Sequence, residues 1–253
     1  MNYGMYLSAA GVLTNSYRQD VIANNLANAE TTGFRRDVPL FHERLISALE
    51  MRSKSGWGEA SMDDQTGGIF AMPTGIDLSQ GELEPTGNPL DSAIVGEGFF
   101  HVQTSDGQNR LTRDGRMLVD RGGRLITQGG YVVLDREGQP ISLDPKQKHA
   151  IDQFGDISAD GQIAAQVGLM KVADARTLKK LGSGLLEYAD PSKLQPAADV
   201  TLQPQTIERG NVSAAVELTK LLDAQRQLEA NANMIRYQDQ MLAKLVNEVG
   251  KIS

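Results

Sequence analysis

Residues 218–249 read LTKLLDAQRQLEANANMIRYQDQMLAKLVNEV. Apolar residues recur in this stretch at alternating spacings of three and four residues. Gln225 and Asp239 interrupt this repeat. The repeat consists of Leu218, Leu221, Gln225, Leu228, Ala232, Ile235, Asp239, Leu242, Val246 and Val249. An average spacing of about 3.5 residues, kept for roughly four heptads, is typical of a coiled-coil seam. We therefore predict one long helix within 211–253, capped by Asn211 or Ser213.

The opposite end of the chain is also helical by pattern. One apolar stripe contains Tyr6, Ala10, Leu13, Tyr17 and Val21, and a second stripe contains Met5, Ala9, Val12, Ile22 and Leu26. A helix with two apolar faces needs covering on more than one side. We predict a helix over about 3–30, ended by the turn at 31–33. It can pair with the C-terminal helix in a hairpin, and its second stripe then stays available to another chain.

Glycine and proline set the middle of the chain apart from its ends. All but five of the 26 Gly and all but one of the nine Pro lie within 46–204, where they break helices and supply turns. Short strands are predicted at 99–103, 110–112, 117–119, 124–127 and 131–134, because turn dipeptides such as Asp106-Gly107 separate them. Further strands are predicted near 141–143, 156–158, 162–172 and 184–188.

The predicted fold class is α+β, with N- and C-terminal α-helices forming a coiled-coil layer, a central all-β domain and extended connectors. The boundaries are an N-terminal helix at 1–36, a connector with a possible hairpin at 37–89 and a β domain at 90–190. A return connector at 191–210 and the C-terminal helix at 211–253 complete the chain.

Composition excludes several classes of function. The net charge of −7 lies entirely within 46–204, since both ends are neutral, so nucleic acid is not expected as a partner. The absence of Cys excludes disulfides and thiolate chemistry. No stretch approaches the roughly 18 apolar residues of a membrane span, so direct membrane insertion is not expected. The N-terminus has no charged and apolar pattern of a cleavable secretory signal.

No motif in the sequence has the spacing or the context that a catalytic or metal site requires. His42, His101 and His149 make no pair at metal-ligand spacing. The motif Gly96-Glu97-Gly98 opens a strand instead of a helix, which favours a bulge over a dinucleotide site. The acidic residues at 152, 156 and 160 are spaced by four, unlike a calcium loop, and are interpreted as turn residues. We predict no catalytic residue, no cofactor and no metal.

Two signatures at the ends of the chain carry a family resemblance. Residues 20–36, DVIANNLANAETTGFRR, closely resemble the N-terminal signature of the bacterial flagellar rod and hook proteins. The segment from Glu208-Arg209-Gly210-Asn211 through Asp239-Gln240-Met241-Leu242 is similar to the matching C-terminal signature. Residues 96–100 and 111–115 also resemble the central β domain of this family.

The resemblance implies a structural subunit, not an enzyme, that polymerises helically in the rod of the flagellar basal body and helps to transmit torque across the periplasm. Its implied partners are copies of itself, other proximal and distal rod proteins, and the flagellar type III export apparatus, which exports unprocessed chains. We expect the C-terminal seam to pack against the first N-terminal stripe, while Asn24, Asn25 and Asn28 make polar subunit contacts. The predicted subunit-assembly residues are Tyr6, Leu13, Tyr17, Val21, Asn24, Asn25, Leu26, Asn28, Gly33, Phe34, Leu218, Leu221, Gln225, Leu228, Ile235, Leu242 and Val249.

Two alternatives remain at this stage. Residues 74–77, 81–83 and 86–91 look more like the proximal rod type, whereas residues 21–25 and Phe99-Phe100 look as much like the distal type. A different class, a carbohydrate-binding or hydrolytic β domain on a coiled-coil stalk, would need a carboxylate pair or an aromatic platform. Only Trp57 and few other aromatic residues are available in the middle of the chain for such a platform.

Overall fold

The computed structural model describes residues 2–43, 69–174, 177–188, 190, 193–197 and 199–249. Two long helices, α1 at Asn2–Ala27 and α3 at Ala214–Val249, bracket the strands. The strands are β1 Asp37–Glu43, β2 Ile69–Ile76, β3 Leu83–Pro85, β4 Ser92–Val95, β5 Phe99–Gln103, β6 Asn109–Thr112, β7 Met117–Val119, β8 Leu125–Thr127, β9 Val132–Val133, β10 His149–Ile151, β11 Asp156–Ala159, β12 Gln162–Gln166, β13 Leu169–Val172, β14 Leu178–Gly182, β15 Leu185–Tyr188, β16 Leu194–Pro196, β17 Thr201–Pro204 and β18 Thr206–Glu208. The predicted α+β class is confirmed.

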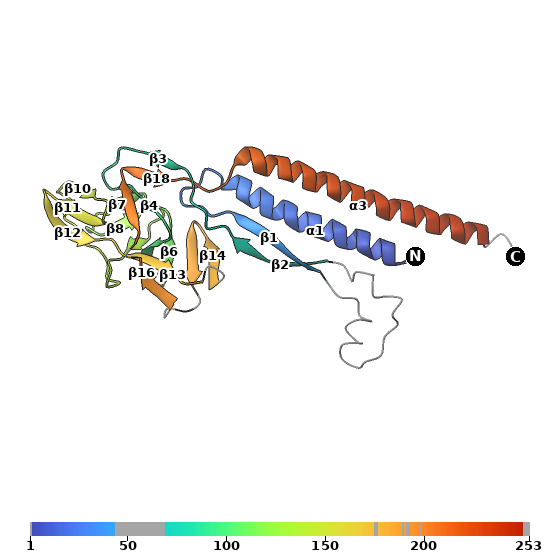
Figure 1. Cartoon of the computed structure of the whole chain (residues 1–253), viewed down its shortest axis with the longest axis horizontal. Coiled ribbons are helices and arrows are strands. Elements are labelled where there is room, and N and C mark those ends of the chain that lie inside the picture. Colours follow the sequence, from blue (N-terminus) through green and yellow to red (C-terminus); the bar gives the residue numbers. More distant parts are fainter. Residues whose placement is uncertain are drawn as a thin grey trace. The chain divides into compact units, whose positions relative to one another are not determined.

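The chain divides into two compact units. The helical unit comprises Met1–Leu26, Asp37–Gly75 and Ser213–Ser253, and the β unit comprises Ala27–Arg36 and Ile76–Val212. In the helical unit, α1 and α3 run side by side in opposite directions, and β1 and β2 form a two-stranded sheet (Figure 1). Residues 44–68 of the predicted connector lie outside the described residues. Neither helix in the described part of the chain is long and apolar enough to cross a membrane.

The two helices meet along a seam of small and amide residues. A Cβ added to Gly4 would lie 2.8 Å from Nε2 of Gln238, and one added to Gly11 would lie 2.8 Å from Nδ2 of Asn231. Both pairs have the same antiparallel register. One heptad further along α1, Arg18 Nη1 donates to Gln227 Oε1 at 3.2 Å. Glycine therefore makes room on α1 for the amides of α3 at successive heptad positions.

This seam differs in part from the predicted one. Leu221, Leu228, Ile235 and Leu242 are half-buried on the inner side of α3 as expected, but Leu218 and Gln225 are exposed. Glu217 and Ala224, one residue earlier, are buried in their place. Tyr6 and Leu13, predicted to pack in the seam, are 46% and 72% exposed. Counting apolar residues selected the wrong alternate positions, because α3 turns Glu217, Ala224, Asn231 and Gln238 inward, and α1 meets the last two with Gly11 and Gly4.

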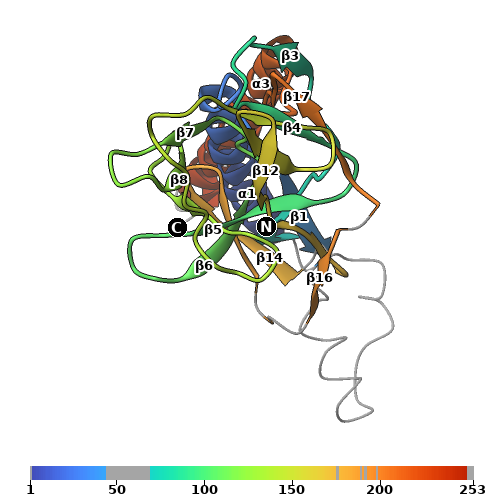
Figure 2. The same cartoon turned by 90° about the vertical axis from the view of Figure 1, so that its left-hand side faces the viewer.

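The β unit is built on an antiparallel sheet whose inward side chains form one core. Strands β5 and β6 pair with Phe100 opposite Thr112 and Gln103 opposite Asn109, across the turn predicted at Asp106-Gly107. Strands β4 and β17 lie side by side (Figure 2) and pair from Ser92–Pro204 to Val95–Thr201. The largest core cluster consists of Ile94, Phe100, Val102, Met117, Leu125, Val133, Ile141, Leu143, Ile151, Ile157, Val167, Leu185 and Leu202. Alternate residues along each strand thus turn toward the core, as the period of two requires.

Three strand predictions differ from the structure. Residues 141–143 form only an isolated bridge, between Ser142 and Arg124. The single strand predicted at 162–172 is two strands, because the chain closes tightly on its neighbour at Gly168, where a Cβ would lie 2.3 Å from the carbonyl oxygen of Asp135. The segment 191–210, predicted as a return connector, contributes strands to the β unit, since β16 pairs with β13, β17 with β4 and β18 with β3.

Candidate assembly surface and junction network

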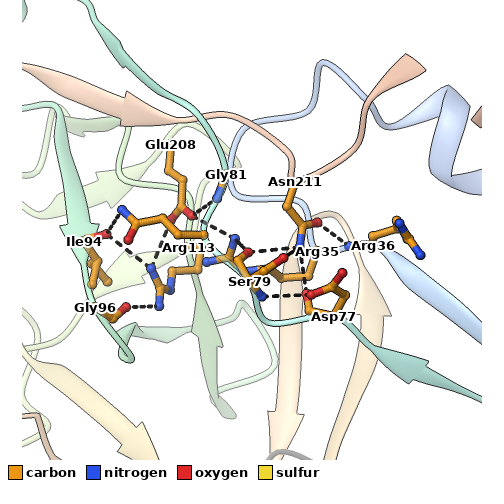
Figure 3. A network of polar contacts seen from close by, with 11 residues as sticks. Arg35, Arg36, Asp77, Ser79, Gly81, Ile94, Gly96, Arg113, Glu208 and Asn211 are labelled. Carbon is orange, nitrogen blue, oxygen red and sulfur yellow. Dashed lines mark hydrogen bonds and ion pairs between the residues drawn. The ribbon is translucent and has the colours of Figure 1, made fainter. Parts of the chain in front are cut away.

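A buried carboxylate gathers two arginines from distant parts of the β unit (Figure 3). Glu208, at the end of β18, is fully buried, and its Oε1 accepts from Arg35 Nη1 at 2.8 Å. Its Oε2 accepts from Arg113 Nη1 at 3.0 Å. The backbone N–H of Gly81 also donates to Oε1, at 2.8 Å. One side chain therefore holds together three segments that are far apart in the sequence.

Two arginines share one directly bonded carboxylate in this cluster. Arg35 and Arg113 are each at most 3% exposed, and both form ion pairs with Glu208. Glu97 attracts Arg113, and Asp77 interacts with Arg35, without a direct ion pair. Burial, and next the charge of Arg35, lower the pKa of Arg113 to about 10, against the attraction of Glu208. Arg113 nevertheless stays protonated at neutral pH. Its Nη2 donates to the carbonyl oxygen of Gly96 at 2.6 Å, and its guanidinium lies 5.2 Å from the centroid of the Phe99 ring.

Asn211 extends the cluster toward the point where the chain leaves the β unit. Its Oδ1 accepts from the backbone N–H of Arg36 at 2.7 Å, and its Nδ2 donates to the carbonyl oxygens of Asp77 and Ser79 at 2.9 and 3.0 Å. Asn211 was a candidate cap of the C-terminal helix. That helix instead begins at Ala214, immediately after Ser213, and the amide of Asn211 binds the backbone of two other segments.

We call Arg35, Arg113, Glu208 and Asn211, with their backbone partners, the junction network. It joins residues 35–36, 77–81 and 208–211, which lie at three of the four points where the chain enters or leaves the β unit. Its hydrogen bonds go to backbone and to its own side chains, so the arrangement positions chain segments, although Arg35 Nε and Nη2 and Arg113 Nε are buried without a hydrogen-bond partner among the described residues. Sequence reasoning missed it, because nothing local in the pattern pairs Glu208 with residues 95 and 173 positions away.

The helical unit carries a large amount of exposed apolar surface. Exposed side chains on its two helices are Tyr6, Leu13, Val216, Leu218, Leu222, Met234, Tyr237, Met241, Leu245 and Val246, each at least 43% exposed. They lie outside the seam between α1 and α3. Large apolar side chains exposed together in this way are typical of an interaction site.

The other predicted assembly residues of the helical unit are distributed differently. Val21 is buried, Leu26 is half-buried, and the Tyr17 hydroxyl donates to the carbonyl oxygen of Met72 at 2.8 Å. Asn25 is buried and exchanges two hydrogen bonds of 2.8 Å with the backbone of Asp37, so its amide serves the fold of its own chain. Asn24 is exposed. The side chain of Val249 lies outside the described residues.

Three predicted residues belong to the turn that follows α1 within the β unit. Asn28 accepts hydrogen bonds from Thr31. Gly33 has φ +68°, and a Cβ there would lie 2.5 Å from the backbone of Arg113, so both its conformation and its position require glycine. Phe34 is buried, with the Lys180 ammonium 3.9 Å from the centroid of its ring.

A helical hairpin with exposed apolar faces, carried in one chain with a closed all-β unit, defines a structural subunit of a larger assembly. Comparison with known families agrees with that class. Residues 5–35 match the family model "Flagella basal body rod protein", residues 93–165 match "Flagellar hook protein FlgE/F/G D1 domain", and residues 203–248 match "Flagellar basal body rod FlgEFG protein C-terminal".

Individual relatives match over nearly their whole length. The chain is 32% identical over 256 residues to the flagellar basal-body rod protein FlgF of Caulobacter vibrioides, covering all of both chains. It is 31% identical to FlgF of Mesorhizobium japonicum, covering 93% of each chain, and 30% identical to the rod protein FlgG of Bacillus subtilis, covering 96% and 97%. The chain therefore belongs to the flagellar basal-body rod protein family. It is a structural subunit of the rod in the flagellar basal body, where it assembles with other rod components.

Proposed function

We propose that the chain is the proximal rod subunit, the type named FlgF among its relatives, and that it polymerises helically with copies of itself and with other rod proteins. The observation that carries the polymerisation is the exposed apolar surface of α1 and α3, which a single chain leaves in water. In this proposal the exposed ridge of Met234, Tyr237 and Met241 packs on the helices of neighbouring subunits.

The predicted subunit-assembly residues fall into two roles in this proposal. Leu221, Leu228, Ile235 and Leu242 hold α3 against α1 within the subunit. Tyr6, Leu13 and Leu218, which the seam leaves exposed, make contacts between subunits. The role is mechanical, without catalysis or a cofactor, and the rod spans the periplasm. The chain reaches it through the flagellar type III export apparatus with its N-terminus unprocessed, a route that rests on the family resemblance alone.

Substitution of the exposed ridge tests the assembly surface. We expect Tyr237→Asp and Met241→Asp to prevent incorporation into basal bodies, because a charge would be buried without a partner at the subunit contact. Asn247→Asp, at an exposed polar position of the same helix off this ridge, is the matched control and should incorporate normally. Circular dichroism of each purified variant checks that helix content is unchanged. Normal motility of cells that carry the Tyr237 and Met241 variants would show that this surface is not a contact between subunits.

Complementation separates the proximal from the distal assignment. We expect the gene to restore swimming to a host that lacks its FlgF-type subunit and not to a host that lacks its FlgG-type subunit. The reverse pattern would assign the chain to the distal rod. Mass spectrometry of the protein in purified basal bodies then tests the export route, since an unprocessed chain retains residues 1–3.

A further inference from the structure

The three-stranded sheet β10–β11–β12 has an outer face that does not pack on the core of the β unit. Its inner row consists of Ile151, Ile157 and Ala165, which pack on the main core cluster. Its outer row, by the same register, consists of Ala150, Ser158 and Ile163. Ile163 is 71% exposed, which makes it the most exposed large apolar side chain described in the β unit.

A second apolar side chain is held out beside this sheet by a fixed turn. Phe154 is 61% exposed. Its backbone N–H donates to Asp152 Oδ1 at 2.8 Å, and its carbonyl oxygen accepts from Gln166 Nε2 at 3.4 Å. Because the backbone is bound on both sides, the exposure of the ring belongs to the folded turn. An apolar group displayed on an ordered surface in this way is typical of a contact with a partner.

Three carboxylates lie around this face, together with the exposed Lys148, which precedes β10 in the same alternation as Ala150. Asp156 lies on the outer face in the same alternation as Ser158, while Asp152 and Asp160 occupy the turns that flank β11. Among the described residues, no Lys or Arg forms an ion pair with these three carboxylates. We call Phe154, Ile163 and the three aspartates the acidic face. Its complement is a surface with an exposed apolar residue and lysines.

Another edge strand of the same unit has that chemistry. β14 is the last strand of the largest sheet, and it carries the exposed Lys179 and the 50% exposed Leu181. Lys179 lies opposite Glu187 of β15, and Lys180, on the other face of the strand, places its ammonium over the Phe34 ring. Leu181 is the extra residue of a bulge, between Lys180 opposite Leu186 and Gly182 opposite Leu185. A bulge and lysines guard an edge against strand addition, so this surface, which we call the basic edge, is suited to side-chain contacts.

We propose that the acidic face of one copy of this chain docks on the basic edge of the next copy, a head-to-tail contact between β units. The inference rests on the proposed function, because it needs copies to lie side by side in the rod. The two patches lie at opposite ends of the β unit (Figure 1), so one chain cannot satisfy both. β12 is itself bulged between Ile157 and Ser158 of its partner strand, which favours packing of side chains over a continuous ladder. Contacts between two different patches repeat from copy to copy, and they produce a helical array when the rotation between copies does not close a ring.

Paired cysteines test the contact directly, because the chain has no cysteine of its own. A chain carrying both Ile163→Cys and Leu181→Cys is expected to give a ladder of cross-linked multimers when basal bodies are oxidised. Either single variant gives no cross-link, since the joined patches differ. The control pair Leu118→Cys with Leu181→Cys, which uses an exposed position on β7, is expected to give monomers. Dimers from Ile163→Cys alone, or a ladder from the control pair, would overturn the proposal.

A charge exchange provides a second readout. Lys179→Glu and Asp156→Lys, each added to the chain with both cysteines, are expected to lower the yield of the cross-link between positions 163 and 181 about tenfold, because like charges then face each other. The double exchange is expected to restore the yield. If the chain incorporates and cells swim, but no ladder forms or the exchange does not rescue it, the head-to-tail contact is wrong while the rod assignment stands. If the chain is absent from basal bodies, both are wrong.

Discussion

At the scale of single residues, the junction network shows where buried charge determines the fold. Glu208 is fully buried between two guanidinium groups, and each of its oxygens accepts from one of them. A buried ion cluster adds little compared with an apolar core of the same shape, but the loss of one member leaves the others buried and unpaired. The prediction of these residues from sequence failed for a physical reason, since ion pairs across 95 or more positions leave no local periodicity.

Replacement of Glu208 tests this account. We expect Glu208→Gln to lower the free energy of unfolding of the β unit by about 3–5 kcal/mol, because two arginines lose their counter-charge while the shape of the side chain is kept. Hydrogen exchange of the β5 and β6 amides measures that free energy. Glu84→Gln, which removes a half-exposed carboxylate 3.6 Å from Arg209, is the control and should change little. Equal effects of the two substitutions would show that burial of the cluster is unimportant.

His101 gives the β unit a dependence on pH. It is 6% exposed, and burial lowers its pKa, with Asp135 acting in the opposite direction. The folded state therefore favours neutral His101, and below the ordinary pKa of 6.5 the unfolded chain binds the proton first. Stability from this group is complete above about pH 6.5 and falls as the pH drops through that value toward the lower folded pKa.

The expected outcome is weaker exchange protection of β5 at about pH 5.5 than at about pH 7.5, after correction for intrinsic exchange rates. His101→Leu should reduce this difference, whatever its effect on absolute stability, because His42 and His149 are kept in both proteins. An unchanged difference in the Leu variant would assign the pH dependence to another group.

At the scale of elements, the helical hairpin was predicted and its register was only half predicted. Leu221, Leu228, Ile235 and Leu242 follow from the apolar repeat. The other seam positions do not follow from it, since Gly11 of α1 and Asn231 of α3 form a pair that an apolar repeat does not detect. The strands were predicted more accurately, because alternation and Gly-containing turns are local signals. Gly168 shows the limit, since its close approach to Asp135 comes from a segment far away in the sequence.

Substitution at Gly11 tests the glycine–amide seam. Alanine raises intrinsic helix propensity by about 1 kcal/mol, but its Cβ would lie 2.8–2.9 Å from three atoms of Asn231. We expect Gly11→Ala to weaken exchange protection at the middle of α1, and Asn231→Ala added to it to restore that protection. The coupling between the two sites, measured as a double-mutant cycle, should be clearly different from zero. Simple additivity would show that the two residues do not touch.

At the scale of the whole molecule, the two units bury their apolar residues differently. The β unit has a closed core in which Ile94, Phe100 and Leu125 are completely buried. The helices share a seam of apolar, glycine and amide residues and leave other apolar side chains in water. The sequence-based division into helical ends and a β middle anticipates this contrast, whereas the strands at 194–208 that close the β unit lacked a recognisable pattern.

This contrast predicts how protection is distributed along the chain. In the dilute purified protein, the amides of α1 and α3 are expected to exchange much faster than those of β5, β6 and β8, because exposed helices open locally at low cost. In assembled basal bodies the helices should become protected, since subunits cover their apolar faces. Helices that are as protected as the β unit in the dilute monomer would show that the hairpin is self-sufficient.

The position of Glu208 also has a consequence in time. The chain is made from its N-terminus, so Arg35 and Arg113 leave the ribosome before the carboxylate that neutralises them, and Arg113 precedes it by 95 residues. At about 5–20 residues per second, this interval lasts roughly 5–20 s. During it the two guanidinium groups remain hydrated, because their burial without a counter-charge is costly. The β unit can therefore close only near the end of synthesis, and a chain truncated before residue 208 cannot complete its interior.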